Sequence, residues 1–281
     1  MLRRNFLILA AGVLAGALAF AGAPTYYPPA IGDFDGVNDY LTRGSDLTGN
    51  ANGKEGIFSV WFRVDGRNAA NRDLVQINTA RFRVRLTNGN KFNFVGSNTV
   101  PALIFFLASN TAIAVDSTTW RHVVASWDLL NGTAHVYVDD AEDKAAGGTF
   151  TNDNIDYTAT DWGVGAYPVD GSNKWDGPLA EFYFAQEFLD FSVTANRRKF
   201  IDANGFPVDL GPSGYKPTGT APIIYMRTQF NNAGLNSGTG GDFTINGSPA
   251  YSVGPVPFPL TTWAPSAKRG RSGRGGRSRI H

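Results

Sequence analysis

Hydrophobic and polar residues alternate along much of the chain between residues 30 and 255. The clearest case is GIFSVWFRVD at residues 56–65. The apolar side chains that share one face of this segment are Phe58, Val60, Phe62 and Val64. Because successive side chains of a strand point to opposite sides, this period of two predicts a β-strand with one face against a core. Ser59 and Trp61 would lie on its other face.

A β-hairpin is predicted over residues 80–97. The core positions of its two strands are Phe82, Val84, Leu86, Phe92 and Phe94. Asn88-Gly89 between them is suited to the positive φ angles of a tight two-residue turn. Arg81, Arg83 and Arg85 alternate with the core positions, and we expect these arginines to be solvated on the outer face.

The remaining segments also predict mainly β-strands, with one helix. Residues 120–143 predict a second hairpin with its connection near Asn131-Gly132, and further short strands follow up to residue 247. The polar stretch SVTANRRKFIDANG, residues 192–205, fits one helix, with Ser192 or Thr194 as its cap and Gly205 at its end. No repeat of fixed period appears, which argues against a propeller or a solenoid.

Composition supports a β-rich class. Aromatic residues (20 Phe, 10 Tyr and 6 Trp) pack well on pleated sheets, whereas 33 Gly and 15 Pro favour turns over helices. The absence of Cys excludes disulfides and thiolate sites. We therefore predict an all-β fold, a two-sheet antiparallel jelly-roll sandwich with one short helix, over residues 31–255.

Charge separates the two ends of the chain from the middle. The N-terminal leader, residues 1–23, holds 2 Arg, and the C-terminal tail, residues 264–281, holds 6 Lys or Arg. The middle of the chain therefore has 25 − 8 = 17 basic residues and all 24 acidic residues, a net charge of −7. Residues 1–23 combine two arginines, an apolar run and an Ala19-Phe20-Ala21 cleavage signal, which is the form of an export signal. An uncleaved anchor or a buried N-terminal segment remains the alternative. After cleavage we expect no stable membrane span.

The C-terminal tail, residues 264–281, alternates Arg with Gly and Ser and has no apolar periodicity. Such a segment does not bury enough surface to offset its chain entropy, so we expect it to be disordered. Its positive charges would attract an anionic polymer or nucleic acid, with a strong salt dependence. A solvated tail without a partner is the alternative.

Six segments in order resemble the laminin-G-like, concanavalin A-like lectin and glucanase superfamily. They are FDGVNDYLT, GIFSVWFRVD, WRHVVASWD, GTAHVYVDD, DWGVGAY and WDGPLAEFYFAQEFLD, which together cover about residues 31–190. The end of the domain looks like forms carried by bacteriophage virion or bacterial exported proteins. This resemblance implies a β-sandwich that binds glycans or proteins, or that hydrolyses β-glucans.

The hydrolase branch of this superfamily needs carboxylates that alternate on one strand, about 5 Å apart for a retaining mechanism. The only candidate pair is Glu181 and Glu187, six positions apart with no Asp between them. The missing carboxylate argues against catalysis. His122 falls on the superfamily's W-x-H-V position, where a structural histidine is expected.

Calcium is the cofactor that the resemblance implies for many members. Asp33 and Asp35 could supply hard oxygen ligands, but Ala180 stands where the superfamily often has an Asp that reaches the ion. The alternative is that these acidic residues shape turns.

For ligand binding, the best candidate is the loop GAYPVDGSNKWDG, residues 165–177. Its candidate ligand-binding residues are Tyr167, Asp170, Asn173 and Trp175. An aromatic platform beside carboxylate and amide groups suits sugar hydroxyls. Trp175 also matches a core aromatic of the superfamily, so packing is its alternative role.

The sequence thus predicts non-catalytic recognition of carbohydrate or a surface polymer by a secreted, cell-surface or virion-surface protein. A phage decoration or tail-associated module that mediates assembly with other virion proteins is the alternative. A divergent β-glucanase ranks third.

Overall fold

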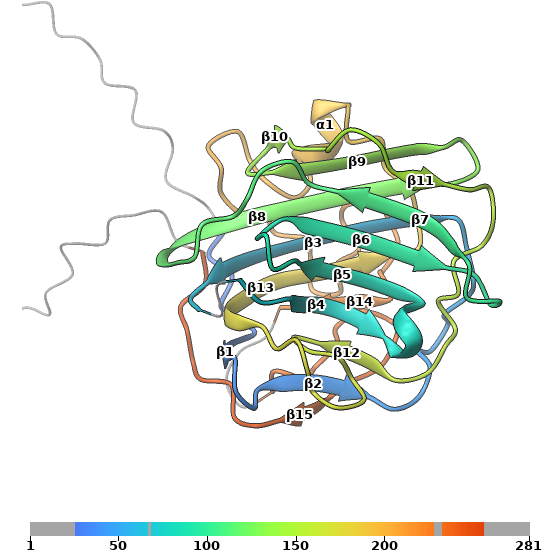
Figure 1. The fold of residues 1–281 in the computed structure, drawn as a ribbon. Helices are drawn as coiled ribbons and strands as arrows, with labels where there is room; N and C mark the ends of the chain where they lie inside the picture. The colour runs from blue at the N-terminus through green and yellow to red at the C-terminus, as the bar shows by residue number, and fades with distance from the viewer. Residues whose placement is uncertain (1–25, 67–68, 228–231, 256–281) are drawn as a thin grey trace, which may run out of the picture.

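The computed structural model describes residues 26–66, 69–227 and 232–255. The predicted leader (1–23) and basic tail (264–281) lie outside the described residues. Figure 1 shows two β-sheets that pack face to face, and every pairing between their strands is antiparallel. The predicted all-β sandwich is confirmed.

One sheet has seven strands. Its order is β1 (Gly32–Asp35), β13 (Asp176–Ala185), β3 (Glu55–Val64), β8 (Asp116–Asp128), β9 (Thr133–Val138) and β10 (Ala141–Glu142), with β14 (Ile224–Met226) paired to β13. The other has eight strands, in the order β11 (Thr149–Phe150), β7 (Leu103–Ala108), β6 (Phe92–Ser97), β5 (Phe82–Leu86), β4 (Arg72–Ile77), β12 (Trp162–Val164), β2 (Tyr40–Arg43) and β15 (Thr244–Asn246). A short 3₁₀ turn, η1 (Asn78–Ala80), links β4 to β5.

The core lies between the two sheets, where the predicted alternation places it. Phe58, Val60 and Phe62 of β3 face Phe82 and Phe92 of the other sheet across this core. Aromatic rings meet edge to face, as between Phe62 and Phe92, whose centroids are 5.2 Å apart at 83°.

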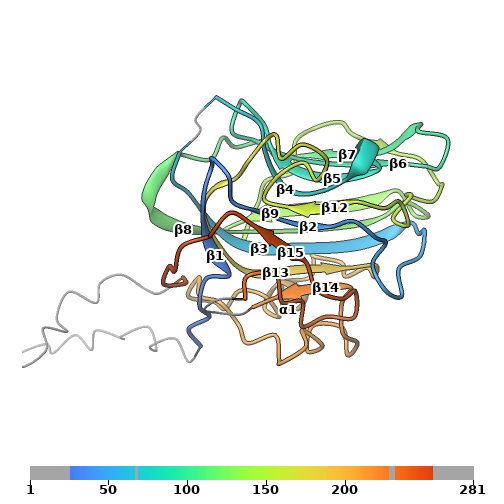
Figure 2. The ribbon, with the colours of Figure 1, turned by 90° about the horizontal axis from the view of Figure 1, so that it is seen from below.

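A third layer covers the outer face of the seven-stranded sheet. Figure 2 shows the chain around α1 (Thr194–Arg197) beneath this sheet, on the side away from the eight-stranded sheet. A second hydrophobic cluster fills the space, built from Ile57, Val124, Tyr137, Tyr183, Ala185, Phe191, Phe200, Leu210 and Tyr225. β3 is therefore buried on both faces, and its Ile57 and Trp61 contact this layer rather than solvent.

The predicted helix exists but is much shorter than residues 192–205. α1 spans four residues, and Val193 rather than Ser192 or Thr194 stands at its N-cap, without a side-chain hydrogen bond. The Ser192 hydroxyl instead donates to Asp190 at 2.6 Å. Burial of Phe200, at 1% exposure, explains why the chain leaves the helix after one turn.

The first predicted hairpin is confirmed as β5 and β6, but its turn differs. The residue with positive φ is Asn90, at 58°, rather than Asn88-Gly89. The backbone N–H of Asn90 donates to the carbonyl of Thr87 at 2.8 Å, and the N–H of Thr87 donates to that of Lys91 at 2.9 Å. The loop is thus one residue longer than the predicted turn, and Asn tolerates the left-handed conformation that this requires.

Strand β13 departs from simple alternation at Ala180 and Glu181, where its pairing with β3 shifts. Leu179 and Phe182 both face the main core, so two residues lie between successive core positions. Glu181 takes the left-handed φ of 48° that this bulge demands. In the described part of the chain, no helix has the length and apolar character needed to cross a bilayer.

Candidate functional site

The predicted ligand loop lies against the outer face of the eight-stranded sheet. The N–H of Trp175 donates to the carbonyl of Gly165 at 2.7 Å, and the N–H of Tyr167 donates to that of Ser172 at 2.8 Å, which closes the loop on itself. It folds onto β12 at Gly163, where a Cβ would lie 2.5 Å from the Ala166 carbonyl oxygen. Glycine is what allows this close approach.

Three of the predicted ligand residues line this part of the surface. The Tyr167 hydroxyl donates to the Asn78 side-chain oxygen at 3.0 Å, and the Asn173 carbonyl accepts the Asp73 N–H at 2.8 Å. Asp170 stands exposed at the loop tip, where hydrogen bonds from Ser172 hold the pKa of its carboxyl below the usual range. The loop thus presents an ionised acceptor and is anchored to β4 at Asp73 and to η1 at Asn78.

Trp175 does not lie at the surface with the other three predicted ligand residues. Its side chain is fully buried in the main core, with its ring edge to face with Phe62 at 5.9 Å and 85°. The loop turns inward at this residue because a large indole gains more from burial than from exposure. The prediction of Trp175 as a ligand platform is wrong, and its packing alternative holds.

The arginines of the first predicted hairpin, Arg81, Arg83 and Arg85, are not solvated as predicted. Arg81 and Arg85 have side-chain exposures of 16% and 13%, and Arg83 is half-buried. Arg85 donates to Asp73 of β4 through Nε at 2.6 Å, and the Asp73 carboxylate is fully buried. Burial raises the pKa of Asp73, which the Arg85 guanidinium opposes. The outer face of β4 and β5 is thus a packed polar surface.

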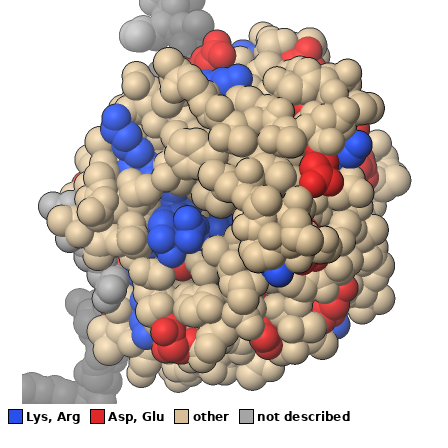
Figure 3. All heavy atoms as spheres, turned by 45° about the vertical axis from the view of Figure 1, so that its right-hand side comes forward, with Lys and Arg blue, Asp and Glu red and all other residues tan. Residues whose placement is uncertain are grey.

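Strand register extends this polar surface across the sheet. One row of outward residues, paired strand to strand, runs Thr42, Gly163, Gln76, Arg83, Val95, Phe106 and Thr149. Figure 3 views this side obliquely and shows Lys and Arg side chains gathered in a hollow of the surface. Polar groups on the same face as the partly exposed Phe106 offer both hydrogen bonds and apolar contact.

Sequence reasoning missed Arg83, Arg85, Asp73 and Gln76 as site residues. The sequence does show polar residues, Asp73 and Gln76, on the segment that pairs with the arginine-bearing strand. Without the strand order, however, nothing indicates that these residues meet, or that the loop around Tyr167 lies beside them.

The predicted calcium ligands have other partners. Asp35 Oδ1 accepts the backbone N–H groups of Val37, Asn38 and Asp39 at 2.7, 2.9 and 3.2 Å, which is the turn-shaping alternative. Asp33 lies 3.7 Å from Arg63.

Burial, followed by the Asp65 charge, raises the pKa of Asp33 to about 6. Arg63, which also pairs with Asp65 at 2.5 Å, therefore already supplies a cation to these carboxylates. Among the described residues, no group of three or more His, Asp or Glu side chains is arranged to hold a metal ion. Asp33 and Asp35 do not fit a calcium site.

The carboxylates considered for catalysis face separate partners. Glu181 is 2% exposed and accepts hydroxyl hydrogen bonds from Tyr26 at 2.8 Å and Tyr225 at 2.6 Å. Burial raises the pKa of Glu181 to about 7. Glu187 accepts a hydrogen bond from Thr220. Neither carboxylate has the other as a hydrogen-bond partner, and Glu181 lies in the layer interior.

A serine and a histidine meet in the same interior. The Ser59 hydroxyl and His122 Nε2 are 2.8 Å apart, and both residues are buried, at 2% and 0% exposure. The His122 ring stacks on Trp61 at 4.8 Å, and burial lowers the pKa of His122 to about 3. A neutral, inaccessible imidazole serves packing, as expected for a structural histidine.

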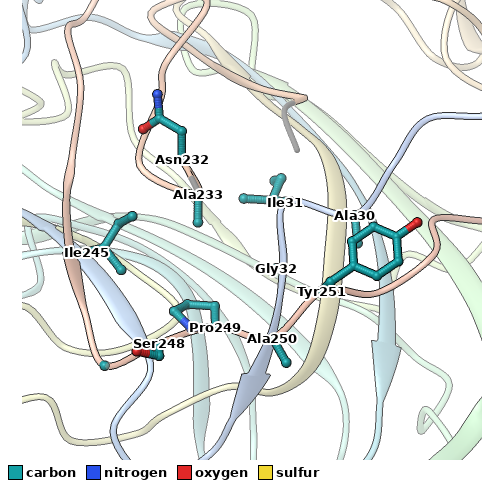
Figure 4. Close-up of a pocket in the computed structure, with 11 residues that line it drawn as sticks. Ala30, Ile31, Gly32, Asn232, Ala233, Ile245, Ser248, Pro249, Ala250 and Tyr251 are labelled. Carbon is teal, nitrogen blue, oxygen red and sulfur yellow. The ribbon is translucent and has the colours of Figure 1, made fainter. Parts of the chain in front are cut away.

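A pocket of about 330 Å³ lies elsewhere, where β1 meets the C-terminal part of the described chain (Figure 4). Its walls combine apolar residues, such as Ile31, Ala233 and Ile245, with the polar residues Asn232 and Ser248, and Tyr251 lies at one side. It shares no lining residue with the loop at residues 165–175 or with β5.

A family model described as the concanavalin A-like lectin/glucanases superfamily matches residues 35–190, which is more than half of the 281 residues. The chain belongs to this superfamily. No curated protein matches the sequence of this chain.

Three solved structures are similar to this chain. A candidate carbohydrate-binding protein from Bacteroides ovatus ATCC 8483 has a TM-score of 0.57 at 12% identity, over 84% of this chain and 63% of that one. The heptameric SAP-like pentraxin from Limulus polyphemus has a TM-score of 0.46 at 14% identity, over 79% and 93%. Domains LG4-5 of the mouse laminin α1 chain have a TM-score of 0.41 at 17% identity, over 61% and 44%. The chain spans less than two thirds of the Bacteroides protein, and the likeness shows the fold alone.

Proposed function

We propose that this superfamily member binds carbohydrate or another surface polymer, without catalysis, on the outer face of its eight-stranded sheet. The observation that carries the proposal is the meeting of the loop around Tyr167 and Asp170 with the polar row of β4 and β5 on one open face. Sugar recognition needs convergent donors and acceptors beside apolar surface, and this face supplies both.

Three features support a binding role over hydrolysis. Glu181 is enclosed by Tyr26 and Tyr225, so it does not reach a substrate on the surface. Glu187 lies apart from it against Thr220. The loop, in contrast, holds an ionised Asp170 and a half-buried Tyr167 that are available at the surface.

The cellular setting is a further proposal. The leader over residues 1–23 supports export, with a secreted, cell-surface or virion-surface location. N-terminal sequencing of the native protein tests this. A mature N-terminus just after Ala21 is expected, whereas an intact Met1 on soluble protein would contradict export.

A glycan array tests the proposed binding face. We expect wild type to bind a subset of glycans, and Tyr167→Ala and Asp170→Ala each to weaken binding about tenfold or more. Tyr27→Ala is the matched control, because Tyr27 is 51% exposed and lies outside this face. Equal binding by all four proteins would refute the location, and binding of no glycan by wild type would refute the function.

A further inference from the structure

Arg83 differs from the nearby Arg81 and Arg85 in having no hydrogen-bond or ion-pair partner. Arg81 pairs with Asp156 at 3.5 Å, and Arg85 pairs with Asp73 at 2.6 Å and contacts Gln76 at 3.3 Å. Within the described residues, Arg83 makes no hydrogen bond or ion pair, and its Nε is buried without a partner. A half-buried guanidinium thus keeps one donor, the Nε–H group, that is buried without a hydrogen-bond partner.

The charged groups around Arg83 include one more positive charge than negative charges. Three guanidinium groups (Arg81, Arg83 and Arg85) stand against two carboxylates (Asp73 and Asp156), and both carboxylates are already paired. Burial and the neighbouring Arg85 charge lower the pKa of Arg83, and the charge of Asp73, which is already paired with Arg85, opposes this only in part. Because a guanidinium stays protonated in proteins, Arg83 remains a cation that is incompletely compensated.

An unpaired, partly desolvated cation lowers the stability of a fold unless something binds it. The position of Arg83 suits such binding, since it lies in the middle of the outward row, between Gln76 on β4 and Val95 on β6. Planar guanidinium donors bind carboxylate or sulfate oxygens in a fixed fork geometry. The loop around Tyr167 folds over Gly163, which pairs with Gln76 on the side away from Arg83.

We infer that the ligand of this face carries an anionic substituent, a carboxylate or a sulfate on a polysaccharide, and that Arg83 binds this substituent. The inference rests on the proposed function and adds the chemical class of the ligand. Tyr167 and Asp170 would contact neutral parts of the same chain, while Arg83 selects for the charge.

The experiment uses the full chain on an array of neutral, carboxylated and sulfated glycans, with Arg83→Gln, Arg83→Lys and Lys216→Gln beside wild type. Lys216→Gln removes one positive charge from the layer on the opposite sheet, where Lys216 is 46% exposed and pairs with Asp209. It controls for unspecific attraction of polyanions, including attraction by the basic tail. Thermal melts of all variants verify folding.

We expect wild type to prefer acidic glycans. Arg83→Gln should lose about 10- to 100-fold in affinity for these glycans, whereas Lys216→Gln should keep the wild-type affinity. Arg83→Lys should keep only part of the wild-type affinity for acidic glycans, because an ammonium group lacks the planar fork of a guanidinium. The carboxylated and sulfated sets show which anion is recognised.

Exclusive binding of neutral glycans, or equal affinities of Arg83→Gln and Lys216→Gln for acidic glycans, would overturn this inference and leave the proposed function standing. Failure of wild type to bind any glycan would overturn both. Because Arg83 has no partner, Arg83→Gln should melt at or above the wild-type temperature, and so its loss of binding would not reflect unfolding.

Discussion

The two sheets of the sandwich have opposite outer faces. The outer face of the seven-stranded sheet is closed by the layer around α1, in a cluster that buries Tyr183, Phe200 and Tyr225. The outer face of the eight-stranded sheet is packed with polar side chains and remains at the surface. In Figure 2 the additional chain lies on one side of the sandwich only.

The difference shows how the same alternation can serve two purposes. On β3 the residues opposite the core include the apolar Ile57 and Trp61, and a third layer buries them. On β5 the corresponding residues are arginines, which are too costly to bury without partners. Apolar outer residues therefore add to stability, whereas polar outer residues leave a face free for recognition.

The largest expected effect comes from opening the covered face. Phe200→Ala removes a ring that is 1% exposed and meets Tyr183 at 5.3 Å and Phe191 at 5.7 Å. We expect a loss of about 3–5 kcal/mol in the free energy of unfolding, measured by urea denaturation. Val193→Ala is the control on the same segment, at 47% exposure, and should stay within about 0.5 kcal/mol. A loss below about 1 kcal/mol for Phe200→Ala would mean that this layer contributes little.

The next effect distinguishes two arginines of the open face. Arg85→Gln leaves the buried Asp73 carboxylate without its partner, so the free energy of unfolding should fall by about 3 kcal/mol. Arg83→Gln should leave it unchanged or raise it slightly, because no pair is broken. Urea denaturation of the two variants side by side measures the difference, and similar losses would contradict the distinct roles of these arginines.

An effect of similar size follows from titration of Glu181 on the covered side. The folded pKa of about 7 lies above the ordinary value of 4.5, so the stability that Glu181 contributes is full below about pH 4.5 and is lost as the pH rises to about 7. The decline would amount to roughly 3 kcal/mol.

The measurement is the pH dependence of the unfolding free energy for wild type and Glu181→Gln between pH 4 and 8. We expect the wild-type curve to fall more steeply with pH than the Glu181→Gln curve. Glu187→Gln serves as the control and should keep the wild-type slope. Parallel curves for wild type and Glu181→Gln would show that Glu181 ionises normally.

The smallest expected effect concerns metal. Because Asp35 is bound by backbone amides and Asp33 faces Arg63, EGTA should leave the melting temperature unchanged. A drop of several degrees that added calcium reverses would place an ion in the fold.

Much of the fold could be predicted from local pattern. The alternation in residues 56–65 and 80–97 identifies β3, β5 and β6 and their core faces, because strand periodicity depends only on neighbouring residues. The bulge at Glu181 and the early end of α1 at Arg197 could not be predicted. Both depend on tertiary packing, which overrides local propensity where a chain must bury residues such as Phe182 and Phe200.

The candidate site was only partly predictable for the same reason. The composition of the loop pointed to Tyr167, Asp170 and Asn173, and these do lie at the surface or partly buried. Trp175 was misassigned because sequence alone does not show which way an aromatic residue at the end of a loop turns. Arg83 was overlooked because its lack of a partner becomes visible only when β4, β5 and β6 are side by side.

Hydrogen–deuterium exchange of the full chain, with and without the glycan that binds best on the array, tests most directly that the open face is the binding face. We expect glycan to slow exchange in residues 81–97 and 163–175, and to leave residues 191–225 and the pocket segments 30–32 and 245–251 unchanged. Protection confined to the covered layer or to the pocket, with none in β5 or the loop, would contradict the assignment.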